Sequence, residues 1–298
     1  RSNYHMKTLL TFLMIEAVLL CSVSAQSLVN RVWLAFYGSP DTITWAASIT
    51  DPLGNLYTTG NTLSPPNGTD VLLTKYAPDG NVLWQKTFDH HGRNDYGIAI
   101  LWHPNDEITI AAALYATADS FDIGLLRFSA NCNLLWSETY DYQGQNDLPT
   151  ALAEDNNGNL YVCAASQGNT TDLDYLTLKV SQDGTLLWNT HYDFASGRDV
   201  PVSLVVGNEI TVTGASEDSA GQWDFYTVMY NNSDGSIIEQ YRLDKPGIGF
   251  DEPAGIARDI SGNFYLTGRA SDNGTDYYIQ TVKLDAQLNL LWDVAYTH

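Results

Sequence analysis

The chain has 298 residues, and its 35 acidic side chains outnumber its 14 basic ones, giving a formal charge of −21 at pH 7. A surface of that sign repels phosphate backbones and anionic lipid headgroups, so the composition argues against nucleic acid and membrane surfaces as partners. The hydrophobic content of 44% is sufficient for a large buried core.

The first 25 residues have the features of an export signal that follows a short N-terminal extension. Met6-Lys7 supplies a positive region, Leu9 to Leu20 form an apolar run, and Val23-Ser24-Ala25 offer small residues for cleavage. The apolar run is too short to span a bilayer stably. We therefore expect residues 1–25 to be extension and signal peptide, and residues 26–298 to be the folded domain. The protein is expected to be secreted or at the cell surface, with no integral membrane span.

Beyond residue 30 the chain repeats a cycle of short strand patterns and tight turns. In the third copy, strands are predicted at residues 150–155, 160–165 and 175–180, and a further strand runs through Trp188. Turn residues such as Asp183-Gly184, which tolerate the backbone angles of tight turns, separate them. Each cycle has four strand patterns and no helical one, which predicts an all-β fold.

The turn-and-tryptophan phrase fixes the length of the repeat. It recurs at Trp84, Trp136, Trp188, Glu239 and Trp292, with spacings of 52, 52, 51 and 53 residues. Four antiparallel strands in about fifty residues are typical of a β-propeller blade. We predict a β-propeller with five complete repeats of about 52 residues from Trp33 to Trp292. Residues from Trp292 to His298 would begin a sixth, so the ring would be cut short at the C-terminus.

The second strands end on a column of small residues. Its members are Gly60, Ala112, Ala164, Gly214 and Gly268. Because larger side chains do not occur in this column, we expect another backbone to pass close to it.

Residues 253–268, with the sequence Pro-Ala-Gly-Ile-Ala-Arg-Asp-Ile-Ser-Gly-Asn-Phe-Tyr-Leu-Thr-Gly, resemble the bacterial SBBP-type β-propeller repeat. The Asp-Gly-Asn-Leu-Leu-Trp phrase is similar to repeats in exported Bacteroidetes proteins. The resemblance covers residues 31–298 and implies a propeller, export, and a C-terminal sorting domain for type IX secretion beyond His298. The turn also resembles that of propellers that bind pyrroloquinoline quinone, but no cofactor-binding residues of that family can be placed on this sequence.

A column of aspartates opens the first strands of the repeats. Its members are Asp41, Asp95, Asp147, Asp199 and Asp251. In a propeller these positions surround one rim of the central channel, where a ring of carboxylates could hold Ca²⁺ through oxygen ligands. The alternative is structural, because a short carboxylate can accept hydrogen bonds from backbone N–H groups of its own turn or of the next blade. A residue present in every blade favours the structural interpretation.

Candidate binding residues lie where the repeat is broken. The segment 89–95 contains His90, His91 and Arg93, a combination found in no other unit. A metal or catalytic site there would need further ligands at suitable geometry. Trp223, beside a second-to-third-strand loop, is expected to be exposed, where an aromatic ring can stack on a sugar or contact a protein. These four residues form the predicted binding surface.

The sequence contains no Gly-x-Ser-x-Gly, His-Glu-x-x-His or phosphate-binding motif. We therefore expect an exported, non-enzymatic propeller that binds a protein or a glycan through its loop face, as an adhesion or scaffold module. The alternative is a propeller enzyme, such as a lyase, a lactonase or a quinone-dependent dehydrogenase, with its site at the channel mouth. A close approach of His90 or His91 to Asp41 or Asp95 would favour the enzyme.

Overall fold

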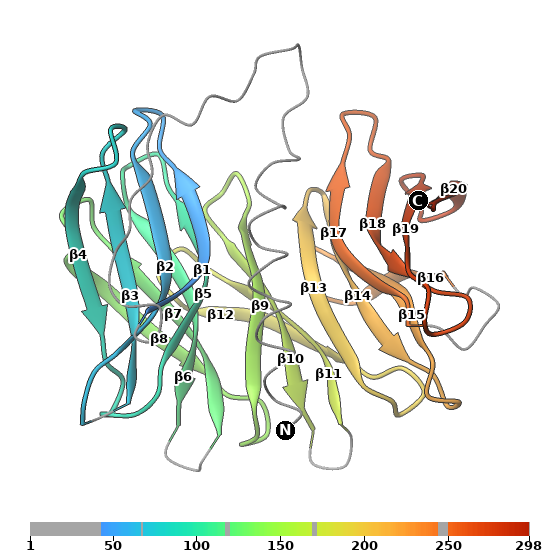
Figure 1. Ribbon diagram of the computed structural model, residues 1–298, viewed down its shortest axis with the longest axis horizontal. Helices are drawn as coiled ribbons and strands as arrows, with labels where there is room; N and C mark the ends of the chain where they lie inside the picture. Colours follow the sequence, from blue (N-terminus) through green and yellow to red (C-terminus); the bar gives the residue numbers. More distant parts are fainter. Residues whose placement is uncertain (1–42, 67, 117–119, 169–171, 244–249, 298) are drawn as a thin grey trace. The chain divides into compact units, whose positions relative to one another are not determined.

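The computed structural model describes residues 43–297, apart from residue 67 and the segments 117–119, 169–171 and 244–249. All of these residues belong to one compact unit, Tyr37–His298. The described part consists of twenty β-strands in five four-stranded antiparallel sheets, and it contains no helix (Figure 1). The predicted all-β fold is confirmed. The predicted signal peptide and the strand through Trp33 lie outside the described residues.

Each sheet is built from four consecutive strands. The first sheet contains β1 (Ile43–Thr50), β2 (Leu56–Leu63), β3 (Thr69–Tyr76) and β4 (Val82–Phe88), and the second contains β5 (Tyr96–Trp102), β6 (Ile108–Tyr115), β7 (Phe121–Phe128) and β8 (Leu134–Tyr140). The third contains β9 (Asp147–Glu154), β10 (Leu160–Gln167), β11 (Leu173–Val180) and β12 (Leu186–Tyr192). The fourth contains β13 (Asp199–Val206), β14 (Glu209–Glu217), β15 (Trp223–Asn231) and β16 (Ile237–Leu243), and the fifth contains β17 (Glu252–Arg258), β18 (Phe264–Ala270), β19 (Tyr278–Leu284) and β20 (Leu290–Tyr296).

The sheet boundaries correct one prediction about the repeat. Trp292 was expected to begin a sixth unit, but it lies in β20, which pairs with β19 as the fourth strand of the fifth sheet. The reason is the hairpin between the third and fourth strands. Its tight turn holds the two strands in one sheet, so the tryptophan strand closes a repeat rather than opening the next.

The small-residue column faces a β-bulge in the first strand of the sheet. In the fourth sheet the register of β13 shifts between Pro201 and Ser203, opposite Gly214. A Cβ atom on Gly214 would lie 2.1 Å from the carbonyl oxygen of Val200, and one on Gly268 would lie 2.1 Å from that of Glu252. The predicted close approach of another backbone is therefore confirmed at these two positions, because the extra residue of the bulge pushes the first strand toward the second.

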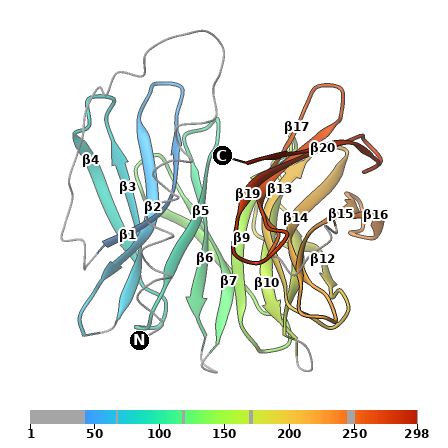
Figure 2. The same cartoon turned by 45° about the vertical axis from the view of Figure 1, so that its right-hand side comes forward.

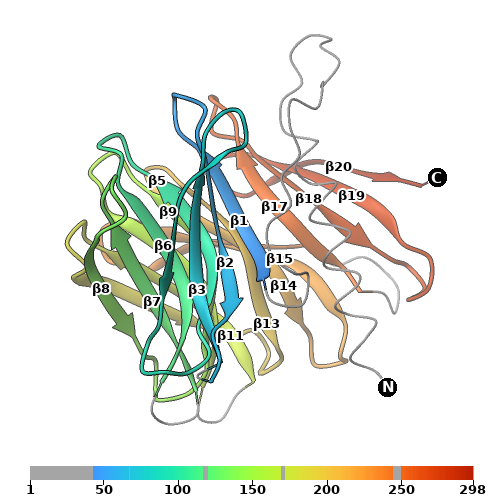
Figure 3. The same ribbon diagram turned by 60° about the vertical axis from the view of Figure 1, so that its left-hand side comes forward.

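Successive sheets pack face to face. Their first strands, β1, β5, β9, β13 and β17, contact one another in that order, and Figures 2 and 3 show the sheets side by side. Apolar side chains from facing sheets make the core between them. Between the third and fourth sheets, for example, Tyr161, Cys163 and Tyr175 pack against Val212, Tyr226 and Val228. The core is therefore divided into layers, each shared by two sheets.

The tryptophan of the fourth strand belongs to this inter-sheet packing. Trp188 is 8% exposed, and its Nε1 donates a hydrogen bond of 3.0 Å to the carbonyl oxygen of Asn232 in the next sheet. It also covers the turn at Gly235, where an added Cβ would lie 2.5 Å from the indole ring. Trp292, at the equivalent position of the fifth sheet, is 41% exposed.

The exposed Trp292 belongs to a wider apolar face. Side chains alternate between the faces of a strand, so Val282 and Leu284 point toward the fourth sheet and their neighbours point away from it. Ile279, Trp292, Val294 and Tyr296 occupy this second face, and all four are exposed. We call these four residues the outward face of the fifth sheet.

Candidate functional site

The predicted His-His-Arg segment forms a tight turn between β4 and β5. The Oδ1 atom of Asp89 accepts a hydrogen bond of 2.8 Å from the N–H of Gly92. His91 and Gly92 both have positive φ angles, 62° and 66°. Asp and Gly are residues that favour such turns, so the local sequence accounts for this conformation. His91 and Arg93 in this turn are exposed.

Asp95 anchors this turn to the second sheet. Its carboxyl is fully buried, with Oδ2 accepting the N–H of His90 at 2.5 Å and Oδ1 accepting the N–H of Tyr115 at 3.1 Å. Burial raises the pKa of Asp95 to about 6, although these two hydrogen bonds oppose the shift. The carboxyl therefore fixes where the turn lies relative to the end of β6.

Asn94 ties the same turn to the first sheet. Its Oδ1 atom accepts a hydrogen bond of 3.0 Å from the N–H of Thr69, at the start of β3. Gly68 lies so close that a Cβ atom there would be 2.3 Å from the same oxygen. Its φ angle of 110° is also unfavourable for residues with a side chain. The turn is thus held between two sheets.

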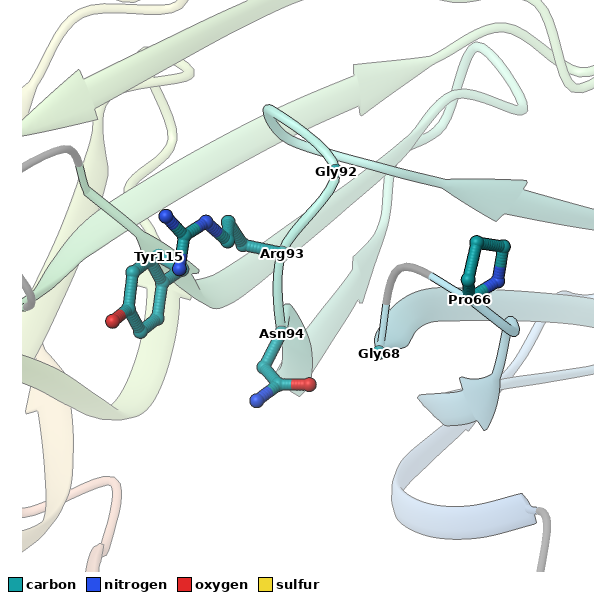
Figure 4. Close-up of a pocket in the computed structure, with 6 residues that line it drawn as sticks. All are labelled: Pro66, Gly68, Gly92, Arg93, Asn94 and Tyr115. Carbon is teal, nitrogen blue, oxygen red and sulfur yellow. The ribbon is translucent and has the colours of Figure 1, made fainter.

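A pocket of about 420 Å³ opens at this place. Its lining residues are Pro66, Gly68, Gly92, Arg93, Asn94 and Tyr115 (Figure 4). Figure 4 shows Arg93 beside the ring of Tyr115, with Pro66 on the other side of the opening. We call this the rim pocket. It combines a guanidinium, an amide and a phenol with the apolar surface of a proline.

Arg93 is held by an aromatic ring instead of a carboxylate. Its guanidinium carbon lies 5.2 Å from the centroid of Tyr115, whose ring packs edge-on against Phe121 at 5.3 Å. Each of the other described arginines is paired with an acid: Arg127 with Glu107, Arg198 with Asp172, Arg242 with Asp218 and Asp224, Arg258 with Glu209, and Arg269 with Glu252. Among the residues that the structure describes, Arg93 alone has no carboxylate partner, so its N–H donors face the pocket and solvent.

The two adjacent histidines do not form a catalytic pair with Asp95. The contact between His90 and Asp95 is made by the backbone N–H, while the imidazole of His90 stacks on Phe88 with ring centroids 6.4 Å apart. The rings of His90 and His91 are 4.0 Å apart and tilted by 59°. Burial and the neighbouring His91 lower the pKa of His90.

The aspartate column makes equivalent clamps at successive sheet junctions. Asp147 accepts the N–H of Tyr142 at 2.6 Å and the hydroxyl of Ser166 at 2.5 Å. Asp199 accepts the N–H of Phe194 at 2.6 Å and the hydroxyl of Ser216 at 2.5 Å, and Asp251 accepts the N–H of Ser271 at 3.0 Å. Asp41 lies outside the described residues. These contacts are of the structural kind that the sequence offered as the alternative to a calcium ring.

Two members of the column belong to separate carboxylate groups. The first group contains Asp122, Asp141 and Asp147, the second contains Asp174, Asp193 and Asp199, and the ligand atoms within each lie within 4.8 Å of one another. Burial and the neighbouring carboxylates raise the pKa values of both Asp147 and Asp199 to about 7. In the described residues, oxygen ligands suited to a hard cation are therefore gathered at two sheet junctions. The partner aspartates recur at the same 52-residue spacing (122 to 174 and 141 to 193), which is the signal that could have identified them.

Trp223 does not contribute to an exposed surface, and that prediction is wrong. It is 9% exposed and stacks on Phe250, with ring centroids 5.6 Å apart and planes 16° apart. The guanidinium carbon of Arg198 lies 5.6 Å from its ring. As the first residue of β15, Trp223 is covered by neighbouring loop residues, whereas the predicted residues His90, His91 and Arg93 share one turn.

Comparison with known protein families gives a match for one segment of the chain. Residues 32–65 match the family model SBBP, described as a beta-propeller repeat, and the predicted resemblance is confirmed for this segment. No curated protein matches the chain. In the described residues, no helix has the length and apolar character needed to cross a membrane.

Solved structures with a similar fold include both enzymes and a protein of unknown function. A europium-containing methanol dehydrogenase matches at a TM-score of 0.50 and 12% identity, over 84% of this chain and 61% of its own. A protein of unknown function from Dyadobacter fermentans matches at 0.51 and 9%, over 86% and 84%. A mutant of Synechocystis apocarotenoid oxygenase matches at 0.52 and 12%, over 86% and 63%. The chain thus spans less than two thirds of the length of either enzyme.

At these identities the likeness concerns the fold alone. Together with the five four-stranded sheets, the match at residues 32–65 identifies the chain as a β-propeller protein that carries an SBBP beta-propeller repeat.

Proposed function

We propose that this propeller is a non-enzymatic binding module that holds a protein or a glycan at its loop face. The observation that carries the proposal is the rim pocket, which forms where the first inter-sheet turn departs from the repeat. Arg93 supplies unpaired N–H donors there, and Tyr115 and Pro66 supply flat surfaces against which a sugar ring or a side chain can pack.

Binding is favoured over catalysis by the arrangement of the titratable groups. A general acid or base needs a side chain within hydrogen-bond reach of the reacting atom, usually oriented by a second group. Here both carboxylate oxygens of Asp95 accept hydrogen bonds from backbone N–H groups, and the imidazole of His90 packs on Phe88. The enzymes among the similar structures share only the fold with this chain. A propeller enzyme is therefore kept as the second candidate function, and no residues are assigned to its active site.

We also propose that the protein is exported and acts in the medium or at the cell surface. The support is the signal-like segment at residues 1–25. Expression with this segment intact, followed by N-terminal sequencing of the extracellular protein, is the test. A mature protein that begins at Gln26 is the expected result, and retention of the uncleaved chain inside the cell would contradict it.

The binding proposal is tested by screening the full chain on glycan and peptide arrays and measuring the affinities of the hits by calorimetry. Arg93→Gln should weaken a rim-pocket ligand about 10- to 100-fold, because a charge-assisted hydrogen bond is lost. Arg269→Gln is the matched control, since Arg269 also lies 5.1 Å from a tyrosine ring but outside the pocket. Hits whose affinity is unchanged by Arg93→Gln, or that are chemically converted, would contradict the proposal.

A further inference from the structure

The junction between the third and fourth sheets contains a tyrosine whose equivalent is missing one repeat earlier. The ring of Tyr226 stacks on Tyr192, with centroids 5.6 Å apart and planes 22° apart, and lies 4.9 Å from Phe194. Its hydroxyl is 2.5 Å from that of Tyr192 and donates to Oε1 of Gln240 at 2.7 Å. One phenol ring thus fills the space between two aromatic walls, and a side-chain amide binds its hydroxyl.

The strand register identifies the equivalent residues at the junction between the second and third sheets. Tyr226 lies opposite Gly214, and Leu176 lies opposite Ala164, the preceding member of the same small-residue column. Leu176 therefore takes the place of Tyr226. The two aromatic walls are present here as well, because Tyr140 and Tyr142 stand 52 residues before Tyr192 and Phe194. Asn189 takes the place of Gln240.

A cavity of about 200 Å³ occupies this place. Tyr140, Tyr142, Leu176, Leu178, Leu186 and Asn189 line it, and Thr139 and Asp141 complete the lining. An apolar cavity of about 150 Å³ is known to hold a benzene molecule, so this volume accepts one substituted six-membered ring. We call it the junction cavity. It is the space that a tyrosine ring fills in the following repeat.

The walls of the junction cavity are fixed by contacts of their own. The hydroxyl of Tyr140 donates to the carbonyl oxygen of Gly184 at 2.7 Å. Tyr142 stacks on His191, with centroids 4.7 Å apart and planes only 13° apart. Leu176 and Leu178 are at most 2% exposed, whereas Leu186 at the rim is 40% exposed. The cavity therefore has two held aromatic walls, an apolar floor and an opening to solvent beside Asn189.

We propose that the junction cavity binds a phenol ring supplied from outside the chain. The ring would pack between Tyr140 and Tyr142 over Leu176, as Tyr226 packs in the next repeat, and its hydroxyl would bond to the amide of Asn189. Aromatic stacking and removal of the ring from water provide the affinity. The amide favours phenols over unsubstituted rings, because only a phenol can exchange a hydrogen bond with it. The site is separate from the rim pocket and does not depend on it.

The test is calorimetric or NMR titration of the full chain with p-cresol. We expect saturable binding with a Kd below about 1 mM, which is the range of efficient ligands of this size. Leu176→Tyr should abolish binding, because it supplies the missing ring from the chain itself. Absence of saturable p-cresol binding, or equal binding by a folded Leu176→Tyr variant, would overturn the proposal.

Two further measurements test whether Asn189 binds the hydroxyl and whether the phenol ring comes from a protein or from a small molecule. Asn189→Leu, at an exposed position, should weaken p-cresol about tenfold and leave toluene unchanged. Equal weakening of both ligands would show that the amide does not bind the hydroxyl, and would overturn that part. Titration with N-acetyl-tyrosinamide identifies the source. If it binds as well as p-cresol, the ring is the tyrosine of a protein partner, and if it binds more weakly the ligand is a free phenolic compound.

Discussion

Replacing Asp147 by Asn should reverse the sign of its effect on stability between acidic and alkaline pH. Asp147 is fully buried, and its carboxyl lies within 4.8 Å of those of Asp122 and Asp141. Burial, together with these two charges, raises its pKa from 3.8 to about 7. Because the pKa is higher in the folded state, the stabilising contribution is complete below the unfolded value and is lost as the pH rises through about 7.

The magnitude follows from the difference between the two pKa values. About three pH units at about 1.4 kcal/mol each would give a cost of about 4 kcal/mol for full ionisation in the folded state. Asp141 is exposed, so water reaches one side of the group, and screening reduces the cost to about 2 kcal/mol. Asparagine avoids this cost but weakens the hydrogen bond from the N–H of Tyr142, by about 1 kcal/mol. The variant should therefore be less stable by about 1 kcal/mol near pH 3, where Asp147 is protonated in both states, and more stable by about 1 kcal/mol near pH 9.

Urea unfolding followed by tryptophan fluorescence at these pH values measures the effect as a difference between variant and wild type, which cancels other titrating groups. Asp155→Asn is the control of opposite sign. Burial favours a raised pKa for Asp155, but hydrogen bonds from Asn159 and Tyr161 hold it below its usual value. That variant should be less stable at both pH values. A pH-independent difference for Asp147→Asn would refute the reasoning.

Two comparisons test the packing between sheets. Trp188→Ala should cost about 3–5 kcal/mol of unfolding free energy and Trp292→Ala about 1 kcal/mol, because only the first is buried against a following sheet. Equal costs in urea unfolding would contradict this assignment. Gly144→Ala should cost about 1 kcal/mol for its φ of 70°, since nothing lies near its added Cβ. Gly235→Ala, with a φ of 73°, should cost about 1–3 kcal/mol more because it meets Trp188, and similar melting temperatures for the two variants would show that the indole moves aside freely.

The strands were predictable because turn chemistry and the repeat limit the choices together. The pattern at residues 160–165 falls inside β10 (Leu160–Gln167), and that at 175–180 falls inside β11 (Leu173–Val180). Turns such as Asn157-Gly158 and Asp183-Gly184 mark where hairpins reverse, and the fixed period extends the assignment to the other repeats. The period alone does not show which strand begins a repeat. Trp292 was therefore assigned to a new unit, although β20 closes the fifth sheet.

The candidate site was predictable only in part, because side-chain exposure depends on neighbours that are distant in the sequence. The break in the repeat led to Arg93, but the pocket also needs Pro66 and Tyr115 from other loops and strands. Trp223 was misjudged because Phe250, which covers it, follows 27 residues later (223 to 250) in no recognisable motif. The junction cavity depends on one substitution, Leu176 for a tyrosine, whose meaning appears only once the register is known.

The outward face of the fifth sheet has a consequence for the behaviour of the protein in solution. Ile279, Trp292, Val294 and Tyr296 are exposed on two neighbouring strands, and exposed apolar side chains of this kind favour self-association. The charge of −21 opposes such contacts by mutual repulsion. That repulsion reaches only about 8 Å at physiological ionic strength and about 3 Å in molar salt. Colloidal stability should therefore fall as salt is added, because the acidic surface then no longer keeps the molecules apart.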